Sequence, residues 1–147
     1  MARGVLMKRL PVIVAFCATA VFGLTACSDS SSPSEEATKA ASALCTDLSE
    51  LKGDTAKLRA LNPSSATKDQ VKDAHQAVQD DWNSVKENAG QLREAERSAV
   101  QSAAEDLKKS YEALPGDTTG QDALAKLQPQ ISKLDEATTA AATGLKC

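Results

Sequence analysis

The side chains best suited to chemistry are few in this sequence. His75 is the only histidine, and the four cysteines stand far apart at Cys17, Cys27, Cys45 and Cys147. One histidine excludes the paired Glu-x-x-His motifs of di-metal helical bundles, and no HExxH, CxxC or glycine-rich phosphate loop occurs. Haem bound through His75 alone remains an alternative, but a histidine at the edge of an apolar helical stripe is the simpler interpretation. We therefore expect no metal and no other cofactor.

Carboxylates are numerous, and many occur as close pairs such as Asp80 and Asp81 or Glu105 and Asp106. Most are interleaved with lysine or arginine, which is typical of solvated helix faces. General acid–base catalysis needs a desolvated pair in a cleft, and nothing in the sequence indicates one. Catalysis is therefore the least expected function of this chain.

The first 26 residues have the layout of a signal peptide. Arg3, Lys8 and Arg9 precede an apolar run from Leu10 to Leu24, which is too short for a transmembrane helix. The run ends in the residues Leu24-Thr25-Ala26-Cys27, and serine-rich sequence follows directly. The cysteine therefore stands where the apolar run stops and polar sequence begins.

These four residues resemble the lipobox of bacterial lipoproteins. In that family the thiol of the lipobox cysteine receives a diacylglycerol, a peptidase cuts before it, and the new amine can receive a fatty acyl chain such as palmitate. The resemblance implies that Leu24, Thr25 and Ala26 are the recognised residues and Cys27 the lipidated one. Two or three buried acyl chains suffice for stable membrane attachment. The alternative is an ordinary secretory signal with a cysteine at its end by chance.

The segment after the signal peptide divides into two parts. Residues 27–36 are the lipidated cysteine and a polar stretch rich in serine, which we expect to be a disordered tether. Residues 37–147 are expected to form one domain. A lipobox, a serine-rich tether and an alanine-rich helical domain ending in cysteine together resemble the small uncharacterised lipoproteins of actinobacteria. This resemblance places the chain on the extracytoplasmic face of the cell membrane, held there by lipid.

The charge of the chain after its signal peptide argues against nucleic acid as a partner. Arg3, Lys8 and Arg9 are the only charged residues before Cys27, so 14 basic and 20 acidic residues remain, a net charge of −6. No basic stripe able to displace phosphate counterions is present. The membrane is expected to be contacted through the lipid alone.

Apolar residues recur at alternating spacings of three and four, which predicts an all-α protein. Asn62-Pro63 and Pro115-Gly116-Asp117 are turn signals, and Thr67 with Gln70 matches a capping box. A weaker stop signal lies at Gly90, which suits a helix C′ residue. The stripes comprise Ala41, Leu44, Leu48, Leu51, Thr55 and Leu58; Val71, His75, Val78, Trp82, Val85, Ala89 and Leu92; Val100, Ala103, Leu107, Tyr111 and Leu114; Leu124, Leu127, Ile131, Leu134, Thr138, Ala141 and Leu145.

Two helical arrangements fit these signals. A turn at Gly90 gives an antiparallel bundle of four helices, in which each apolar stripe faces three neighbours. The alternative is three helices with one long central helix from Thr67 to Leu114, against whose two halves the first and last helices pack. We favour four helices because that arrangement buries the stripes better. Pro129 falls inside the last helix, where the apolar phase continues past it, so we expect a kink and not an end.

Cys45 and Cys147 are expected to form a disulfide. They are the two remaining cysteines of an exported chain, and both helical arrangements bring them together. Pairing between molecules through the terminal Cys147 is the rival.

Trp82 and Tyr111 are the only aromatic residues after the signal peptide. Both lie on apolar stripes, so core packing is the default interpretation. The functional alternative is that they line a shared groove for a partner or an apolar ligand, because tryptophan and tyrosine are common anchors. In a four-helix bundle they would lie on adjacent antiparallel helices and could touch.

Three functions remain open for the anchored domain. The first is a non-catalytic interaction module that presents helix faces to another protein of the cell envelope. The second is a carrier of a small apolar ligand between its helices, and the third is an enzyme. No sequence motif names the partner or the ligand.

Overall fold

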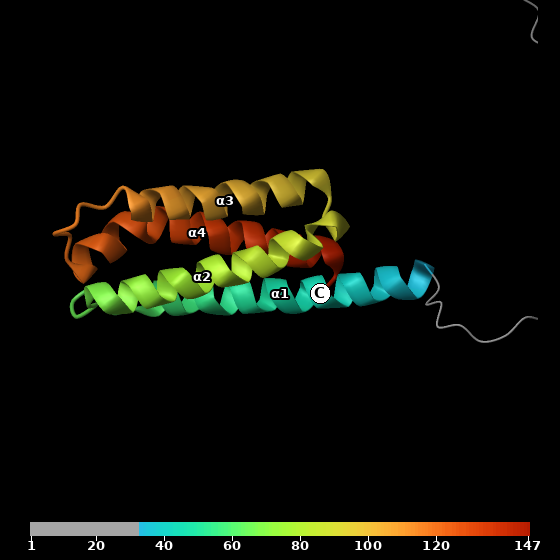
Figure 1. The fold of residues 1–147 in the computed structure, drawn as a ribbon, viewed down its shortest axis with the longest axis horizontal. Coiled ribbons are helices and arrows are strands. Elements are labelled where there is room, and N and C mark those ends of the chain that lie inside the picture. Colours follow the sequence, from blue (N-terminus) through green and yellow to red (C-terminus); the bar gives the residue numbers. More distant parts are fainter. Residues whose placement is uncertain (1–32) are drawn as a thin grey trace, which may run out of the picture. The chain divides into compact units, whose positions relative to one another are not determined.

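A computed structural model of the chain describes residues 33–147, which form four α-helices joined by short connections (Figure 1). No strand occurs in this range. The predicted all-α antiparallel bundle of four helices is confirmed, and the single long helix from Thr67 to Leu114 is excluded. The helices are α1 Pro33–Ala60, α2 Lys68–Asn88, α3 Glu94–Glu112 and α4 Gly120–Leu145, and a short 3-10 helix, η1 Ala89–Gln91, follows α2.

The expected signal peptide and the lipobox-like residues Leu24, Thr25, Ala26 and Cys27 lie outside the described residues, as does most of the expected tether. Its last four residues, 33–36, are instead the first turn of α1. Pro33 is tolerated there because the first helical N–H groups need no intrahelical acceptor. Glu35 and Glu36 complement the positive end of the helix dipole. The helical domain therefore begins earlier than the expected residue 37.

Side-chain caps fix where α2 and α4 begin. The backbone N–H of Gln70 donates to the Thr67 hydroxyl over 3.2 Å, and the Thr67 N–H donates to the Gln70 side chain over 2.9 Å. This is the predicted capping box. Thr119 plays the same part for α4, where its hydroxyl accepts from the Asp122 N–H over 3.1 Å. Each cap satisfies an N–H group that the first helical turn leaves open.

The chain does turn at Gly90, but not in the predicted way. No glycine in the range 33–147 has a positive φ, so Gly90 is not a left-handed C′ residue. The chain instead tightens into η1, where the Leu92 N–H donates to the carbonyl of Ala89 over 3.0 Å. Ala89 and Leu92 are both buried and fix this turn against the core. Residues of a 3-10 turn have negative φ, so the turn does not need the left-handed conformation that glycine can adopt.

The helices pack unevenly around their shared core. The contacts of α1 with α2, of α3 with α4 and of α1 with α4 are extensive, whereas α2 and α3 touch at few positions. The expectation that every stripe would face three neighbours is therefore wrong at this edge. The core consists mainly of aliphatic side chains, with the fully buried Leu44, Leu48, Leu51, Leu58, Leu107, Leu124, Leu127, Ile131, Leu134, Val71, Val78 and Val85. Pro129 is exposed, and α4 continues past it as expected.

A disulfide joins Cys45 of α1 to Cys147, with Cα atoms 5.6 Å apart and a sequence separation of 102. Lys146 precedes the bridge in a left-handed conformation with φ 61°. Its N–H donates to the Thr143 carbonyl, and the Cys147 N–H donates to that of Ala142, which together form a Schellman cap. The cap ends α4 and the disulfide fixes the chain end to α1.

Within residues 33–147 no helix has both the length and the apolar character to span a bilayer.

Candidate binding groove between α2 and α3

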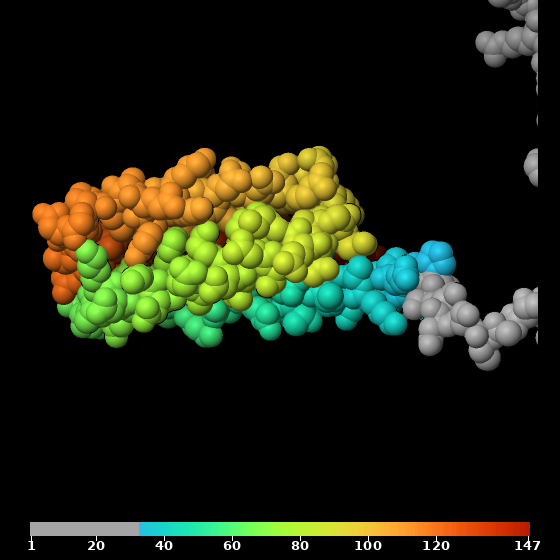
Figure 2. All heavy atoms as spheres, viewed as in Figure 1, coloured from blue at the N-terminus to red at the C-terminus, as the bar shows by residue number. Residues whose placement is uncertain are grey.

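A cavity of about 690 Å³ lies along the edge where α2 and α3 touch least, and we call it the α2–α3 groove. In Figure 2 the seam between α2, green to yellow, and α3, orange, faces the reader. The α2 residues recur every three or four positions, so they share one face of that helix. The lining is Lys72, His75, Gln76, Gln79, Trp82, Asn83 and Lys86 from α2, and Ala104, Glu105, Lys108, Lys109, Tyr111 and Glu112 from α3.

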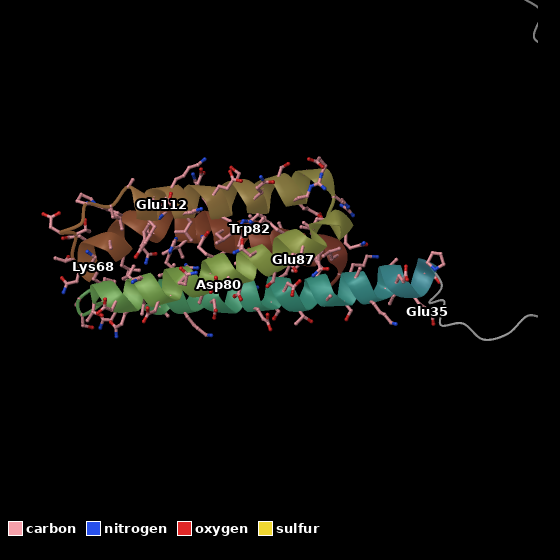
Figure 3. The ribbon with its side chains drawn as sticks, in the orientation of Figure 1. Glu35, Lys68, Asp80, Trp82, Glu87 and Glu112 are labelled. Carbon is pink, nitrogen blue, oxygen red and sulfur yellow. A yellow bond between two sulfur atoms is a disulfide. The ribbon has the colours of Figure 1, made fainter. Side chains whose placement is uncertain are left out.

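Trp82 and Tyr111 both line the α2–α3 groove, but the ring that contacts Tyr111 is a different one. Tyr111 stacks on His75 with ring centroids 4.0 Å apart. Trp82 lies two helical turns beyond His75 along α2, between α2 and α3 (Figure 3), and is only 5% exposed. The Lys86 ammonium lies 5.9 Å from the centre of the indole ring, a cation–π distance. Both aromatic residues therefore pack in the domain and border the groove as well.

His75, which lines the groove, is buried more deeply than expected for a histidine at the edge of an apolar stripe. Its side chain is 6% exposed, and its Nε2 atom has no hydrogen-bond partner. Burial lowers the pKa of His75 to about 4, Glu112 opposes this shift, and Lys108 adds to it. The imidazole is therefore neutral at neutral pH. A buried nitrogen without a partner costs about 1–3 kcal/mol, so Nε2 is suited to bind a group that the chain itself does not supply.

Gln79, one turn further along α2, also has a buried polar atom that forms no hydrogen bond. Its side-chain nitrogen is also buried without a hydrogen-bond partner. An amide nitrogen can only donate, whereas either nitrogen of a neutral imidazole can carry the proton. The two groups can therefore donate together to an oxygen-rich ligand in the α2–α3 groove.

The rim of the groove on α2 is cationic. On α3, Lys108 pairs with Glu112 at 3.8 Å, and Lys109 pairs with Glu105 at 4.0 Å. Lys72 and Lys86 on α2 have no ion pair anywhere in residues 33–147. The described chain has 14 basic and 19 acidic residues. A local excess of positive charge on an acidic domain favours a ligand with negative charge.

A second cavity of about 260 Å³, the end pocket, adjoins the groove where α3 leads into α4. Tyr111 and Glu112 line both cavities. The remaining lining is largely apolar and consists of Lys68, Val71, Leu114, Pro115, Gly116, Thr118 and Ala123. The ammonium of Lys68 donates to the Gly116 carbonyl and connects α2 to the loop. Figure 3 labels Lys68 and Glu112 at this end of the bundle, which is opposite to the Cys45–Cys147 disulfide.

Asp81 departs from the solvated face that the sequence predicts for it. The side chain is half-buried, and one of its oxygens has no partner. Burial raises the pKa of Asp81 to about 6, and the carboxylates of Asp54 and Glu50 raise it further. Asp81 lies three residues after Val78 and four before Val85, both buried, so the sequence places it beside the buried face of α2. In residues 33–147, no group of three or more histidine, cysteine or acidic side chains is arranged to hold a metal ion.

Comparison of the chain with known protein families, curated proteins and solved structures gives no match. The interpretation of the α2–α3 groove as a binding site therefore depends on its geometry alone. It offers two unpartnered nitrogen groups, two unpaired ammonium groups and two aromatic rings. Such a set can hold a ligand through hydrogen bonds, charge and ring contacts.

Proposed function

We propose that this protein is a lipid-anchored, extracytoplasmic component of the cell envelope that acts as a non-catalytic interaction module. The residues Leu24-Thr25-Ala26-Cys27 support the anchor through their resemblance to a lipobox. The single observation that supports the interaction role is the open edge between α2 and α3. A segment of another envelope protein laid along this edge would cover the groove and complete the bundle.

The contents of the groove suit such a partner. Interfaces depend on a few anchor residues, among which tryptophan is frequent, and Trp82 lies on the α2 side, one turn before Lys86. The unpaired Lys72 and Lys86 flank it at either end and favour acidic groups on the partner. The four amide and imidazole side chains between them can bind carbonyl and carboxylate oxygens.

Site-specific crosslinking on intact cells tests this proposal. A photoreactive amino acid replaces Lys86 on the groove rim in one variant and Lys52, an exposed lysine of α1, in the other. We expect one reproducible envelope protein to be captured from position 86 and not from position 52. Equal capture from both positions, or capture from neither, would contradict a partner in the groove.

The anchor has its own test. Replacing Cys27 by alanine removes the thiol that would carry the diacylglycerol, so we expect the variant to leave the membrane fraction. Replacing Cys17, within the apolar run, is the matched control and should leave attachment unchanged. A Cys27→Ala protein that stays with membranes would refute the lipid anchor.

A second candidate function, a carrier of a small ligand, is favoured by one further observation. The end pocket is lined mainly by apolar groups and opens beside the groove. The core between the helices is filled with leucine side chains, so the end pocket is the better place for an apolar ligand. Mass spectrometry of the purified protein under native conditions would detect a co-purifying ligand of defined mass.

A further inference from the structure

We propose that the end pocket and the α2–α3 groove form one site for an anionic amphiphile, with its alkyl chain in the end pocket and its carboxylate or phosphate group beside Lys72 and His75. This inference rests on the second candidate function above, the ligand carrier, and gives its ligand a chemical class. The shared chemistry is a single alkyl chain that ends in an anionic head group.

The two cavities adjoin at Tyr111. This residue and Glu112 line both of them, and the Tyr111 ring is held at the junction by stacking on His75. On α2 the neighbouring residues Val71 and Lys72 line different cavities. Val71 lines the end pocket and Lys72 lines the groove. An apolar and a cationic environment therefore meet within one turn of α2.

The end pocket suits an alkyl chain. Val71, Leu114, Pro115 and Ala123 supply apolar surface around a volume of about 260 Å³. The Lys68 ammonium keeps its charge, but its hydrogen bond to the Gly116 carbonyl holds it against the loop. Each methylene group that enters such a pocket should improve binding about fourfold until the pocket is full.

The head group would meet three nitrogen donors in the groove. Lys72 has no ion pair within the described range, and the Nε2 of the neutral His75 has no partner. The amide nitrogen of Gln79, also unpartnered, lies one turn beyond. The two carboxylates that line the groove, Glu105 and Glu112, are each paired with a lysine of α3, at 4.0 Å and 3.8 Å. An uncharged head group would leave Lys72 unpaired, and a cationic one would be repelled by Lys72.

Trp82 provides the readout, because it is the only tryptophan in the chain and lies in the groove. The full chain with Cys27→Ala is titrated without detergent, below the micelle concentration of each probe. The probes are alkyl carboxylates of increasing length, an alkyl phosphate, an alcohol and an alkyl trimethylammonium. We expect a saturable change in Trp82 fluorescence with the carboxylates and the phosphate, and the comparison of these two identifies the head group.

Two variants assign the binding to this site. Lys72→Gln should weaken carboxylate binding about tenfold or more and leave alcohol binding unchanged. Lys52→Gln, on the exposed face of α1, is the matched control and should change neither. Affinity should rise about fourfold per methylene and then level off.

Several outcomes would overturn the inference. These are the absence of saturable binding, equal binding of the alcohol or the ammonium probe, and equal effects of Lys72→Gln and Lys52→Gln. Capture of an envelope protein from position 86 without amphiphile binding would refute the ligand class and leave the interaction module standing. Failure of both experiments would refute both proposals separately.

Discussion

The imidazole of His75 and the phenol ring of Tyr111 stack with their centroids 4.0 Å apart and their planes 10° from parallel. They join α2 to α3 along an edge where these helices otherwise touch little. The stacked pair also lies where the α2–α3 groove meets the end pocket. One contact between rings thus connects two helices and shapes the proposed site.

The first prediction concerns the energy of this contact. Replacing His75 and Tyr111 by alanine, singly and together, forms a double-mutant cycle. We expect a coupling free energy of about 0.5–1.5 kcal/mol, as for stacked aromatic pairs. Urea unfolding of the four proteins measures it. Strictly additive effects would mean that the rings touch without stabilising one another.

The second prediction concerns the pH dependence of stability. The pKa of His75 is about 4 in the folded chain, against 6.5 for an ordinary histidine. The unfolded chain therefore binds more protons between these values, and the free energy of unfolding falls as the pH decreases from 6.5 toward 4. The loss is of the order of 3 kcal/mol at most. The variant His75→Gln should lack this component in urea unfolding measured across the range.

Glu112 and Lys108 of α3 face His75 and have opposing effects on its pKa. Lys108 lowers the pKa of His75, so replacing Lys108 by glutamine should raise this pKa toward its ordinary value. The pH range over which the free energy of unfolding falls should then become narrower. A His75→Gln protein with an unchanged pH profile would show that another group is responsible.

Asp81 predicts the opposite pH response. Its pKa is raised from 3.8 to about 6, so the folded chain binds more protons than the unfolded chain between these values. The free energy of unfolding therefore falls as the pH rises from about 4 to 6. Asp81→Asn should make the protein more stable at pH 7 and abolish this fall. Asp80→Asn, on the exposed neighbour, is the control, and an equal gain from it would argue against burial as the cause.

The architecture was largely predictable because it depends on local patterns. The spacing of Leu44, Leu48 and Leu51 is that of a helix whose one face is buried, and all three are buried. The capping box of Thr67 and Gln70 needs only residues three apart. The Cys45–Cys147 pairing was expected from the number of remaining cysteines. Each of these signals is contained in a short stretch of sequence or in a count.

The site was only partly predictable because it depends on distances between helices. Trp82 and Tyr111 were expected in a shared groove or in the core, and they occupy both. Nothing in an apolar stripe shows how far the neighbouring helix stands from it, so the open edge and the stacking of Tyr111 on His75 were not predicted. The environment of Asp81 was missed for the same reason, because Asp54 and Glu50 belong to a different helix.

The fourth prediction concerns the disulfide. Replacing Cys45 and Cys147 by serine frees a loop with a sequence separation of 102 residues, and the chain-entropy treatment gives a loss of about 4–5 kcal/mol. Chemical unfolding of the wild-type and double-variant proteins measures the difference. A loss below about 1 kcal/mol would contradict the prediction that the disulfide stabilises the protein by restricting the unfolded chain. Disulfide-linked dimers of the wild-type protein under non-reducing conditions would instead support pairing between molecules.

The last prediction compares two glycines in helices. A Cβ atom at Gly120 would overlap the carbonyl oxygen of Ala66 and the carbonyl carbon of Thr67. Both are backbone atoms of the turn before α2, so the start of α4 and this turn would have to separate. We expect Gly120→Ala to lower the free energy of unfolding by about 2–3 kcal/mol, as overpacking does.

Gly53 is the matched control for this close approach. It lies exposed inside α1, and a Cβ atom there would meet nothing within 4 Å. Gly53→Ala should therefore stabilise the protein by about 0.5–1 kcal/mol, because alanine loses less backbone entropy than glycine in a helix. Urea unfolding of both variants would show shifts of opposite sign. If Gly120→Ala were stabilising as well, α4 could not approach the turn before α2 as closely as the structure has it, and the end pocket beside Ala123 would be wider than described.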